Sequence, residues 1–161
     1  LDSFEIAEKE GFLESRIGRK LKSFNSPGKV HFRDCGAYGN QLVFFPNGDI
    51  GVCQGYLGHR KYIVGDVKSS IPYEIIESPI ISKWIFSNPI NRKECFFCPA
   101  IGICGGGCAF NSEIKEGDIS KRNKSFCMHT FLTLDWLIKE SLNRKMKDEN
   151  IYVKEMSFLY R

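Results

Sequence analysis

Hydrophobic residues recur at helical spacing near both ends of the chain. Towards the N-terminus, apolar side chains follow one another at spacings of three or four, with charged residues between them: Leu13, Ile17, Leu21 and Phe24. This period predicts a helix over residues 2–24 that ends at the Pro27-Gly28 turn. A similar pattern over residues 128–147, with basic side chains on the opposite side, predicts a second, amphipathic helix.

The first half of the chain also contains short β-prone runs. Residues 42–45 and 50–53 flank the Asn47-Gly48 pair, and Asn-Gly is the strongest short turn signal. A hairpin is therefore predicted, with its second strand ending on Cys53. Residues 62–64 form a further candidate strand.

The remaining segments complete an α+β prediction. Isoleucines and a tryptophan over residues 73–86 predict a buried helix that is interrupted near Pro79. Residues 88–127 are rich in glycine and cysteine and lack a clean period, so they are predicted to be mostly loop. The expected fold is a small hairpin followed by irregular, cysteine-rich loops, flanked by an N-terminal and a C-terminal helix.

Composition and charge narrow the class of protein without indicating a partner. The chain has 161 residues, 42% hydrophobic and 26% charged, so one domain with a modest core is expected rather than a disordered segment. Its net charge of +4 comes from scattered groups, so no nucleic-acid partner is predicted. Neither a bilayer-spanning apolar run nor a secretory signal pattern is visible, so no membrane partner is predicted. Because residue 1 is leucine rather than methionine, we expect a processed product or a piece of a longer protein.

The cysteines are the unusual feature of the composition. There are seven, an odd number that does not suit a fully paired disulfide framework. Five lie between Cys95 and Cys127, and the other two are Cys35 and Cys53. A chain of this length builds a core without disulfides, so metal binding in a reducing compartment is the simpler interpretation.

The spacing of the cysteines favours an iron–sulfur cluster over zinc. Cys95 and Cys98 are separated by two residues, so a tight turn brings both thiolates to one metal centre. Three glycines, at positions 105–107, allow close approach of a bulky group and expose N–H groups that can point at cluster sulfurs. Zinc ribbons also use cysteine pairs, but usually two tight pairs a dozen or more residues apart.

The order of the cysteines resembles that of a known family. Cys-x12-Gly-x4-Cys over residues 35–53, then Cys-x2-Cys-x5-Cys-x3-Cys over residues 95–108, then Cys127, is similar to the seven-cysteine signature of the SPASM domain. That domain is the C-terminal auxiliary-cluster part of many radical S-adenosylmethionine (SAM) enzymes that modify ribosomally made peptides and proteins. The resemblance covers about residues 31–135.

The resemblance implies two [4Fe-4S] clusters with separate ligand sets. The ligands of the second auxiliary cluster would be Cys95, Cys98, Cys104 and Cys127. The ligands of the first would be Cys35, Cys53 and Cys108. The fourth iron of the first cluster would be open to substrate or water, which we favour, or bound by His31, His59 or Asp34.

The radical-generating core of that class is missing from this sequence. The core needs a Cys-x3-Cys-x2-Cys loop to bind SAM, and no such triplet occurs here. No catalytic residue is therefore predicted, and SAM would be bound only by a presumed full-length enzyme. Residues 1–30 would connect to the absent core, residues 31–135 would form the cluster domain, and residues 136–161 would form a C-terminal helix and tail.

The resemblance implies an auxiliary role in a cytoplasmic peptide maturase. The clusters would carry electrons, anchor a peptide substrate at the open iron, or both. Expected partners are a radical SAM core in the same chain or another, a ribosomally made peptide or protein, and an external electron carrier. The alternatives are a stand-alone, ferredoxin-like electron carrier and a zinc-stapled structural or interaction module.

Overall fold

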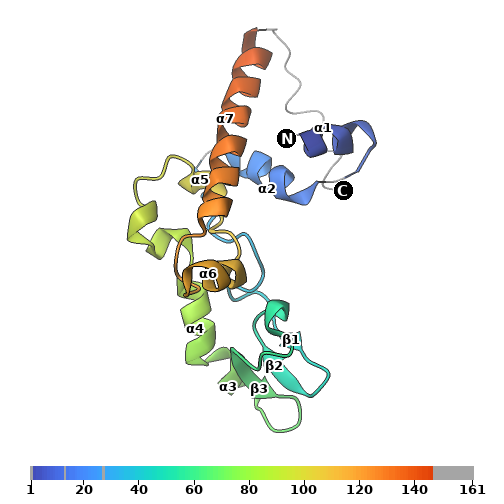
Figure 1. Cartoon of the computed structure of the whole chain (residues 1–161), viewed down its shortest axis with the longest axis vertical. Coiled ribbons are helices and arrows are strands. Elements are labelled where there is room, and N and C mark those ends of the chain that lie inside the picture. Colours follow the sequence, from blue (N-terminus) through green and yellow to red (C-terminus); the bar gives the residue numbers. More distant parts are fainter. Residues whose placement is uncertain (1, 13, 27, 147–161) are drawn as a thin grey trace.

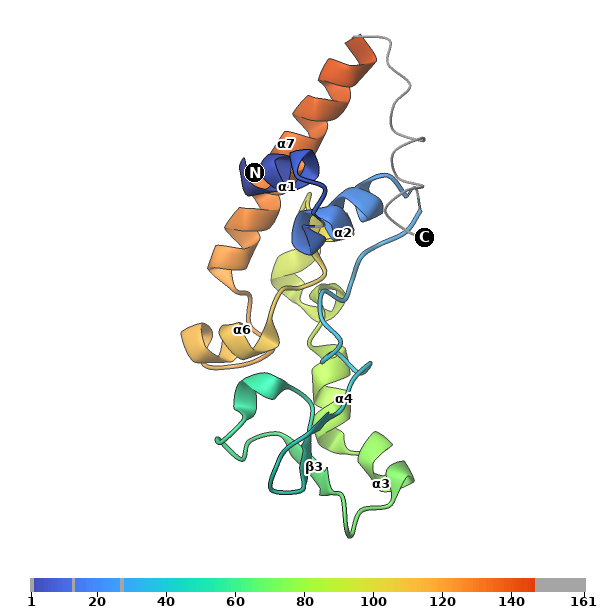
Figure 2. The same cartoon turned by 90° about the vertical axis from the view of Figure 1, so that its right-hand side faces the viewer.

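The elements of the chain lie along one long axis, with helices at one end and a small sheet at the other (Figure 1). The computed structural model describes residues 2–12, 14–26 and 28–146. Figure 2 shows the same arrangement from the side, with α7 (Lys124–Met146) and α2 (Ser15–Phe24) at the helical end and α3 (Pro72–Ile76) beside the sheet. The predicted α+β class, with a hairpin and irregular cysteine-rich segments between terminal helices, is confirmed.

The N-terminal segment forms two helices, so the prediction of one helix over residues 2–24 is wrong. Helix α1 spans Asp2–Lys9, and Gly11 adopts a left-handed φ of +72°, which an α-helix does not allow. Helix α2 then begins at Ser15, where the Glu14 side chain accepts hydrogen bonds from the backbone N–H groups of Arg16 and Ile17. The break therefore has two local causes, a left-handed glycine and a new N-terminal cap.

The predicted hairpin is present as part of a three-stranded antiparallel sheet. Its strands are β1 (Val43–Phe44), β2 (Asp49–Gly51) and β3 (Ile63–Asp66), in that spatial order. At the turn, Gly48 has φ +94° and its N–H donates to the Phe45 carbonyl over 3.0 Å.

The second strand of the hairpin, β2, ends at Gly51 and does not reach Cys53. Cys53 lies two residues beyond β2 and caps a 3₁₀ turn, η1 (Gln54–Tyr56), in which its sulfur accepts from the Gly55 N–H over 3.4 Å. The prediction that the strand ends on Cys53 is therefore off by two residues.

The helix predicted over residues 73–86 is interrupted as expected. Helix α3 ends at Ile76, and α4 (Pro79–Phe86) begins with Pro79, whose missing N–H and fixed φ suit a first helical turn. Trp84 of α4 is buried against the sheet side of the molecule. The core there consists of Ala37, Tyr38, Ile50, Val52, Cys53, Tyr56, Ile75, Ile81, Trp84, Ala109 and Ile119.

The segment 88–127 has more helix than predicted. Two 3₁₀ turns, η2 (Pro89–Asn91) and η3 (Lys93–Cys95), precede α5 (Ile101–Cys104) and α6 (Ala109–Glu116). Each of these elements is too short to show a hydrophobic period in the sequence, which explains why they were not predicted.

The C-terminal helix begins earlier than predicted. Helix α7 starts at Lys124 rather than residue 128, because the Asn123 side chain accepts from the Phe126 N–H over 3.1 Å and caps it. A second core, formed by Ala100, Ile103 and Leu137, joins α2, α5 and α7. The tail at 150–161 lies outside the described residues. Among the described helices, none has the length and apolarity needed to cross a membrane.

Candidate metal centre

All seven cysteines are free thiols, and each is at least partly buried. They lie in loops, at helix ends and in the first turn of α7, so the short elements around them decide where each thiol sits. Within the described part of the chain, no three or more histidine, cysteine or acidic side chains are grouped so as to hold a single metal ion.

One group of thiols lies beside the sheet. Burial raises the pKa of the Cys53 thiol, the Gly55 amide opposes that rise, and the electrostatic effects of Cys108 and Cys35 add to it. Tyr38 is fully buried in the same region, and its hydroxyl donates to the Gly107 carbonyl over 3.1 Å. Burial raises the pKa of Tyr38 to about 12, and Cys108 and Cys35 contribute to the rise.

Each thiol of this sheet-side group has a local structural anchor. The Ala37 N–H lies 3.5 Å from the Cys35 sulfur, and Cys53 caps η1. Cys108 is the residue before α6, and its carbonyl accepts from the Ser112 N–H over 2.9 Å. The three residues therefore come from a loop, the end of the hairpin and a helix start.

The other thiols form a second group beside the helical end. Burial raises the pKa of the Cys95 thiol, and Cys104 and Cys98 add to the rise. Burial likewise raises the pKa of Cys127, with contributions from Cys104, Cys95 and Cys98. The cysteines that act electrostatically on these two thiols are therefore all members of the predicted second ligand set, beside the charged residues Arg92, Glu94 and Arg122.

Cys104 lies near groups that favour its thiolate form. Burial raises its pKa, while the Gly106 backbone N–H and the Lys20 charge oppose the rise. The Thr130 hydroxyl of the same region donates to the Phe126 carbonyl over 3.0 Å.

The glycine segment 105–107 connects the two groups. All three residues have left-handed φ values, of +67°, +82° and +77°, which explains why the sequence needs glycine at each position. A Cβ on Gly105 would lie 2.6 Å from the His31 ring, and one on Gly107 would lie 2.7 Å from the Phe126 ring. The group packed against these glycines is therefore formed by side chains of the protein itself.

Two buried basic side chains, which the sequence analysis did not select, adjoin the second group. Lys20 is 1% exposed, and its Nζ lies 4.5 Å from the centroid of the Phe126 ring. Burial lowers the pKa of Lys20, while Asp34 and the Cys104 thiolate oppose that effect. A signal was available in the sequence, because Lys20 falls three residues after Ile17 on the apolar face of α2.

Arg92 is the second of these basic side chains, with an exposed fraction of 5%. Its guanidinium donates to the carbonyls of Gly106, Ser87 and Ile119, and its Nε is buried without a hydrogen-bond partner. Arg92 also acts electrostatically on Cys95. No sequence pattern indicates this role, since the Gly106 and Ile119 carbonyls come from later segments that only the fold brings to Arg92.

Three residues were predicted as alternative fourth ligands of the first cluster. His31 pairs with the loop after Cys104, since the Gly105 N–H donates to its carbonyl over 2.7 Å. Its Nε2 lies 3.6 Å from the Asp34 carboxylate. Burial raises the pKa of Asp34, but the neighbouring His31 imidazole and the charge of Lys20 outweigh that effect and lower it. His59 is exposed in the loop after η1.

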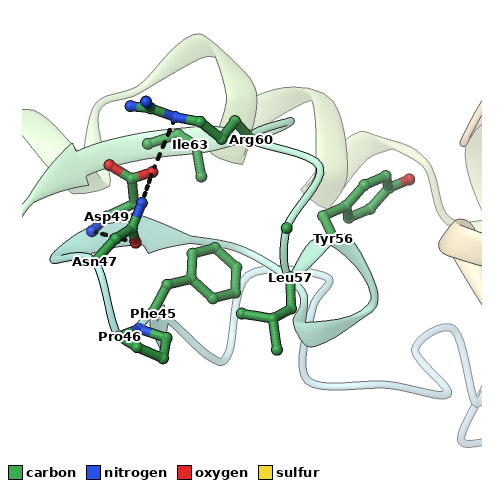
Figure 3. A pocket seen from close by; sticks show the side chains of 9 residues that line it. Phe45, Pro46, Asn47, Asp49, Tyr56, Leu57, Arg60 and Ile63 are labelled. Atoms are coloured by element: carbon green, nitrogen blue, oxygen red, sulfur yellow. Dashed lines mark hydrogen bonds and ion pairs between the residues drawn. The ribbon is translucent and has the colours of Figure 1, made fainter.

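A separate pocket lies beside the hairpin turn, and none of the cysteines lines it (Figure 3). Its polar groups satisfy one another: the Asp49 carboxylate lies 3.4 Å from the Arg60 Nε and 2.8 Å from the Asn47 Nδ2. Phe45 and Leu57 supply apolar walls. This pocket therefore contains none of the predicted cluster ligands.

Comparison with known proteins gives one distant relationship, to a radical SAM enzyme. The relative is the radical SAM cyclopropyl synthase TigE of Paramaledivibacter caminithermalis, which is 28% identical over 115 residues. The match covers 70% of this chain but only 22% of the relative, so the chain spans about a fifth of that enzyme's length. No known protein-family model matches the chain. The comparison supports a radical SAM-associated role with iron–sulfur chemistry as a broad theme.

Proposed function

We propose that this chain is a SPASM-type auxiliary domain that binds two [4Fe-4S] clusters in association with a radical SAM core. The observation that carries the proposal is the pairing of the thiols by their electrostatic neighbours. Cys53 interacts with Cys35 and Cys108, whereas Cys95 and Cys127 interact with members of the other predicted ligand set. The same division follows from the family resemblance, by an independent route.

The donor set suits iron–sulfur clusters on chemical grounds. Cysteine thiolates are the ligands that such clusters use, and soft sulfur donors select them over hard cations. The Gly106 N–H opposes the rise in the Cys104 pKa, and backbone N–H groups directed at ligand sulfurs are known to tune cluster potentials. When bound, the clusters would supply one-electron redox chemistry.

The two groups suit different tasks. The second group offers four thiolates and would hold a fully ligated cluster for electron transfer. The first offers three, Cys35, Cys53 and Cys108, which would leave one iron available to a peptide thiolate or to water. The core partner would supply SAM chemistry, the substrate would be a ribosomally made peptide or protein, and an external carrier would accept electrons.

Anaerobic reconstitution with ferrous iron and sulfide tests this proposal. We expect about eight irons per chain, as two cubane clusters require, together with broad visible absorbance from thiolate-to-iron charge transfer. The matched control replaces both Cys53 and Cys98 by alanine and should bind no intact cluster. A colourless protein that retains tightly bound zinc would instead identify a structural module and overturn the proposal.

A further inference from the structure

A second cavity, of about 480 Å³, lies at the sheet end of the molecule, where β1, α3 and α4 lie close together (Figure 1). Its volume falls in the usual range of ligand sites, about 300–1,000 Å³. The polar side chains in its wall are engaged within the protein: the Gln41 Nε2 donates to the Val52 carbonyl over 3.1 Å, and the Asn40 Oδ1 accepts from Arg33 over 3.2 Å. The cavity therefore offers mainly apolar contacts, from Leu42, Phe44, Ile76, Ile81 and Ile85.

The cavity has a buried floor and an exposed apolar rim. Val52 and Ile81 are buried, whereas Phe44 of β1 is 63% exposed and Ile76 of α3 is 64% exposed. Large apolar side chains exposed around one hollow are typical of a surface that receives apolar groups. The cavity is thus shaped for one apolar side chain that enters between the strand and the helices.

The strand that borders the cavity also has a free hydrogen-bonding edge. Among the described strands, β1 is at the edge of the sheet and pairs only with β2. The Phe45 N–H donates to the Asp49 carbonyl over 2.9 Å, so the alternation of an antiparallel ladder directs the main-chain groups of Phe44 to the free edge. Main-chain donors and acceptors beside an apolar hollow are the features that bind an extended peptide by strand addition.

The cavity adjoins the first group of thiols. Ala37 and Val52 both line it, and both belong to the hydrophobic core that contains Cys53. The Ala37 N–H lies 3.5 Å from the Cys35 sulfur, and Val52 directly precedes Cys53. A peptide held at this edge would therefore lie beside the group whose three thiolates leave one iron open.

We propose that an extended, apolar stretch of the peptide substrate pairs with the free edge of β1 and inserts one side chain into this cavity. This inference rests on the proposed function, because it gives the substrate of the first cluster a binding surface. The strand edge supplies affinity for any extended main chain, and the cavity selects an apolar side chain at one position.

The test measures binding of a defined peptide to the reconstituted full chain. The probe is a fluorescein-labelled peptide of about seven residues in which leucine alternates with serine, matching the two-residue period of a strand. Binding is followed by fluorescence anisotropy. Ile76→Glu should weaken binding at least tenfold, because the entering apolar side chain would desolvate the new carboxylate.

The matched control makes the same change outside the cavity. Ile114 of α6 is 67% exposed and does not line the cavity, so Ile114→Glu should leave the Kd within a factor of two. Equal weakening by the two substitutions would overturn the inference. A concentration-dependent dimer that Ile76→Glu abolishes, seen by analytical ultracentrifugation, would assign the cavity to a second copy of the chain and would also overturn it.

Two further peptides test the strand pairing itself. One carries N-methyl groups on its leucine amides and the other on its serine amides, so that in each peptide alternate N–H donors are missing. Successive amides of a strand point to opposite sides, so only one of the two peptides should lose affinity, at least tenfold. Equal affinities of these two peptides would show that β1 adds no strand.

Iron content separates this inference from the proposed function. A chain that carries about eight irons but does not bind the unmodified peptide at about 1 mM would overturn the inference and leave the proposed function intact. A chain that binds the peptide with the expected pattern but takes up no iron would overturn the proposed function and leave the peptide site.

Discussion

At the scale of single residues, two glycines with nearly the same conformation differ in what surrounds them. Gly105 ends α5 with φ +67° and Gly117 ends α6 with φ +82°, so both positions strain an L-residue. A Cβ on Gly117 would meet nothing within 4 Å, whereas one on Gly105 would also lie 2.8 Å from the Asp34 Cβ. A substitution at Gly117 therefore measures backbone strain alone, whereas one at Gly105, the residue after Cys104, measures strain and steric crowding together.

Replacing each glycine with alanine should give unequal losses of stability. Gly117→Ala should lower the free energy of unfolding by about 1–2 kcal/mol, the cost of a left-handed alanine. Gly105→Ala should lower it by about 3 kcal/mol or more, because the His31 ring and Asp34 must also move. Urea unfolding of the two apoproteins measures the difference, and equal losses would show that the Gly105 site relaxes without cost.

The buried thiols also predict how the stability of the apoprotein depends on pH. The pKa values of Cys53, Cys95, Cys104 and Cys127 are raised in the folded state, so the folded protein keeps these protons to higher pH than the unfolded chain. The contribution of these thiols to the free energy of unfolding is therefore fully present below the unfolded thiol pKa of about 8.5. It is lost as the pH rises from that value through the higher pKa values of the folded state.

This pH dependence is tested by urea midpoints of the apoprotein between about pH 7.5 and 10. We expect the midpoint to fall across this range, and to fall less in Cys104→Ala, which lacks one of the shifted thiols. Staying at or below about pH 10, the unfolded tyrosine pKa, limits the contribution of Tyr38, whose pKa burial raises to about 12. A midpoint that rises with pH would contradict the burial of the thiols.

At the scale of elements, helix α6 is tied to the loop that follows the hairpin. Glu113 of α6 accepts hydrogen bonds from the Tyr56 hydroxyl, from the Tyr62 hydroxyl over 2.7 Å and from the Lys61 Nζ over 2.6 Å. Burial raises the pKa of Glu113, but the bonds from Lys61 and the two tyrosines outweigh it and lower that pKa. Because α6 follows Cys108 directly, this link sets the position of Cys108 relative to the hairpin.

Removing the charge of Glu113 should therefore loosen the sheet-side group. Glu113→Gln should lower the free energy of unfolding by about 2 kcal/mol, since charge-assisted hydrogen bonds become neutral ones. It should also reduce the iron bound by the first group more than that bound by the second, which Cys53→Ala and Cys98→Ala backgrounds distinguish. Glu74→Gln, at an exposed position of α3, is the control and should change neither quantity.

Which elements could be predicted depends on how local their causes are. The hairpin turn and the break at Pro79 follow from the residues at those positions, so the sequence was sufficient. The break between α1 and α2 was missed because a single glycine inside a helical period is usually tolerated, and only its left-handed φ reveals the break. The short helices α5 and α6 end at left-handed glycines before any period can develop.

The candidate site divides in the same way. The spacing of the cysteines and a family resemblance were enough to propose two ligand sets, because those features are written along the chain. The surroundings of the ligand sets could not be predicted from the sequence. Arg92, for example, donates to the carbonyls of Ser87, Gly106 and Ile119, which only the fold brings together. The place of Lys20 on the apolar face of α2 follows from the predicted period, but its contact with the Phe126 ring comes only from the fold.

At the scale of the whole molecule, the two thiol groups belong to two hydrophobic cores. Cys53, with Cys35 packed beside it, is part of the core that contains the sheet residues and Trp84. Cys98 packs against the other core, formed by α2, α5 and α7. The glycine segment 105–107 connects the two regions along the chain. This arrangement favours two sites that fill independently.

Independence predicts distinct outcomes for two single substitutions. Cys98→Ala should leave about four irons per chain, because one cubane cluster loses a ligand while the other keeps all of its own. Cys53→Ala should also leave about four irons per chain, but these irons should belong to the second cluster, whereas Cys98→Ala should leave the first. Iron and sulfide analysis after reconstitution gives the counts, and electron paramagnetic resonance of the reduced proteins shows whether the two remaining clusters differ.

The stability of each variant extends the test to the cores. A cluster that closes a loop stabilises the region that holds it, so Cys98→Ala should expose the helical end to limited proteolysis while the sheet end stays protected. Cys53→Ala should show the reverse. If each substitution abolished both clusters, the two ligand sets would not be separate sites, and the glycine segment 105–107 would have to transmit the loss from one core to the other.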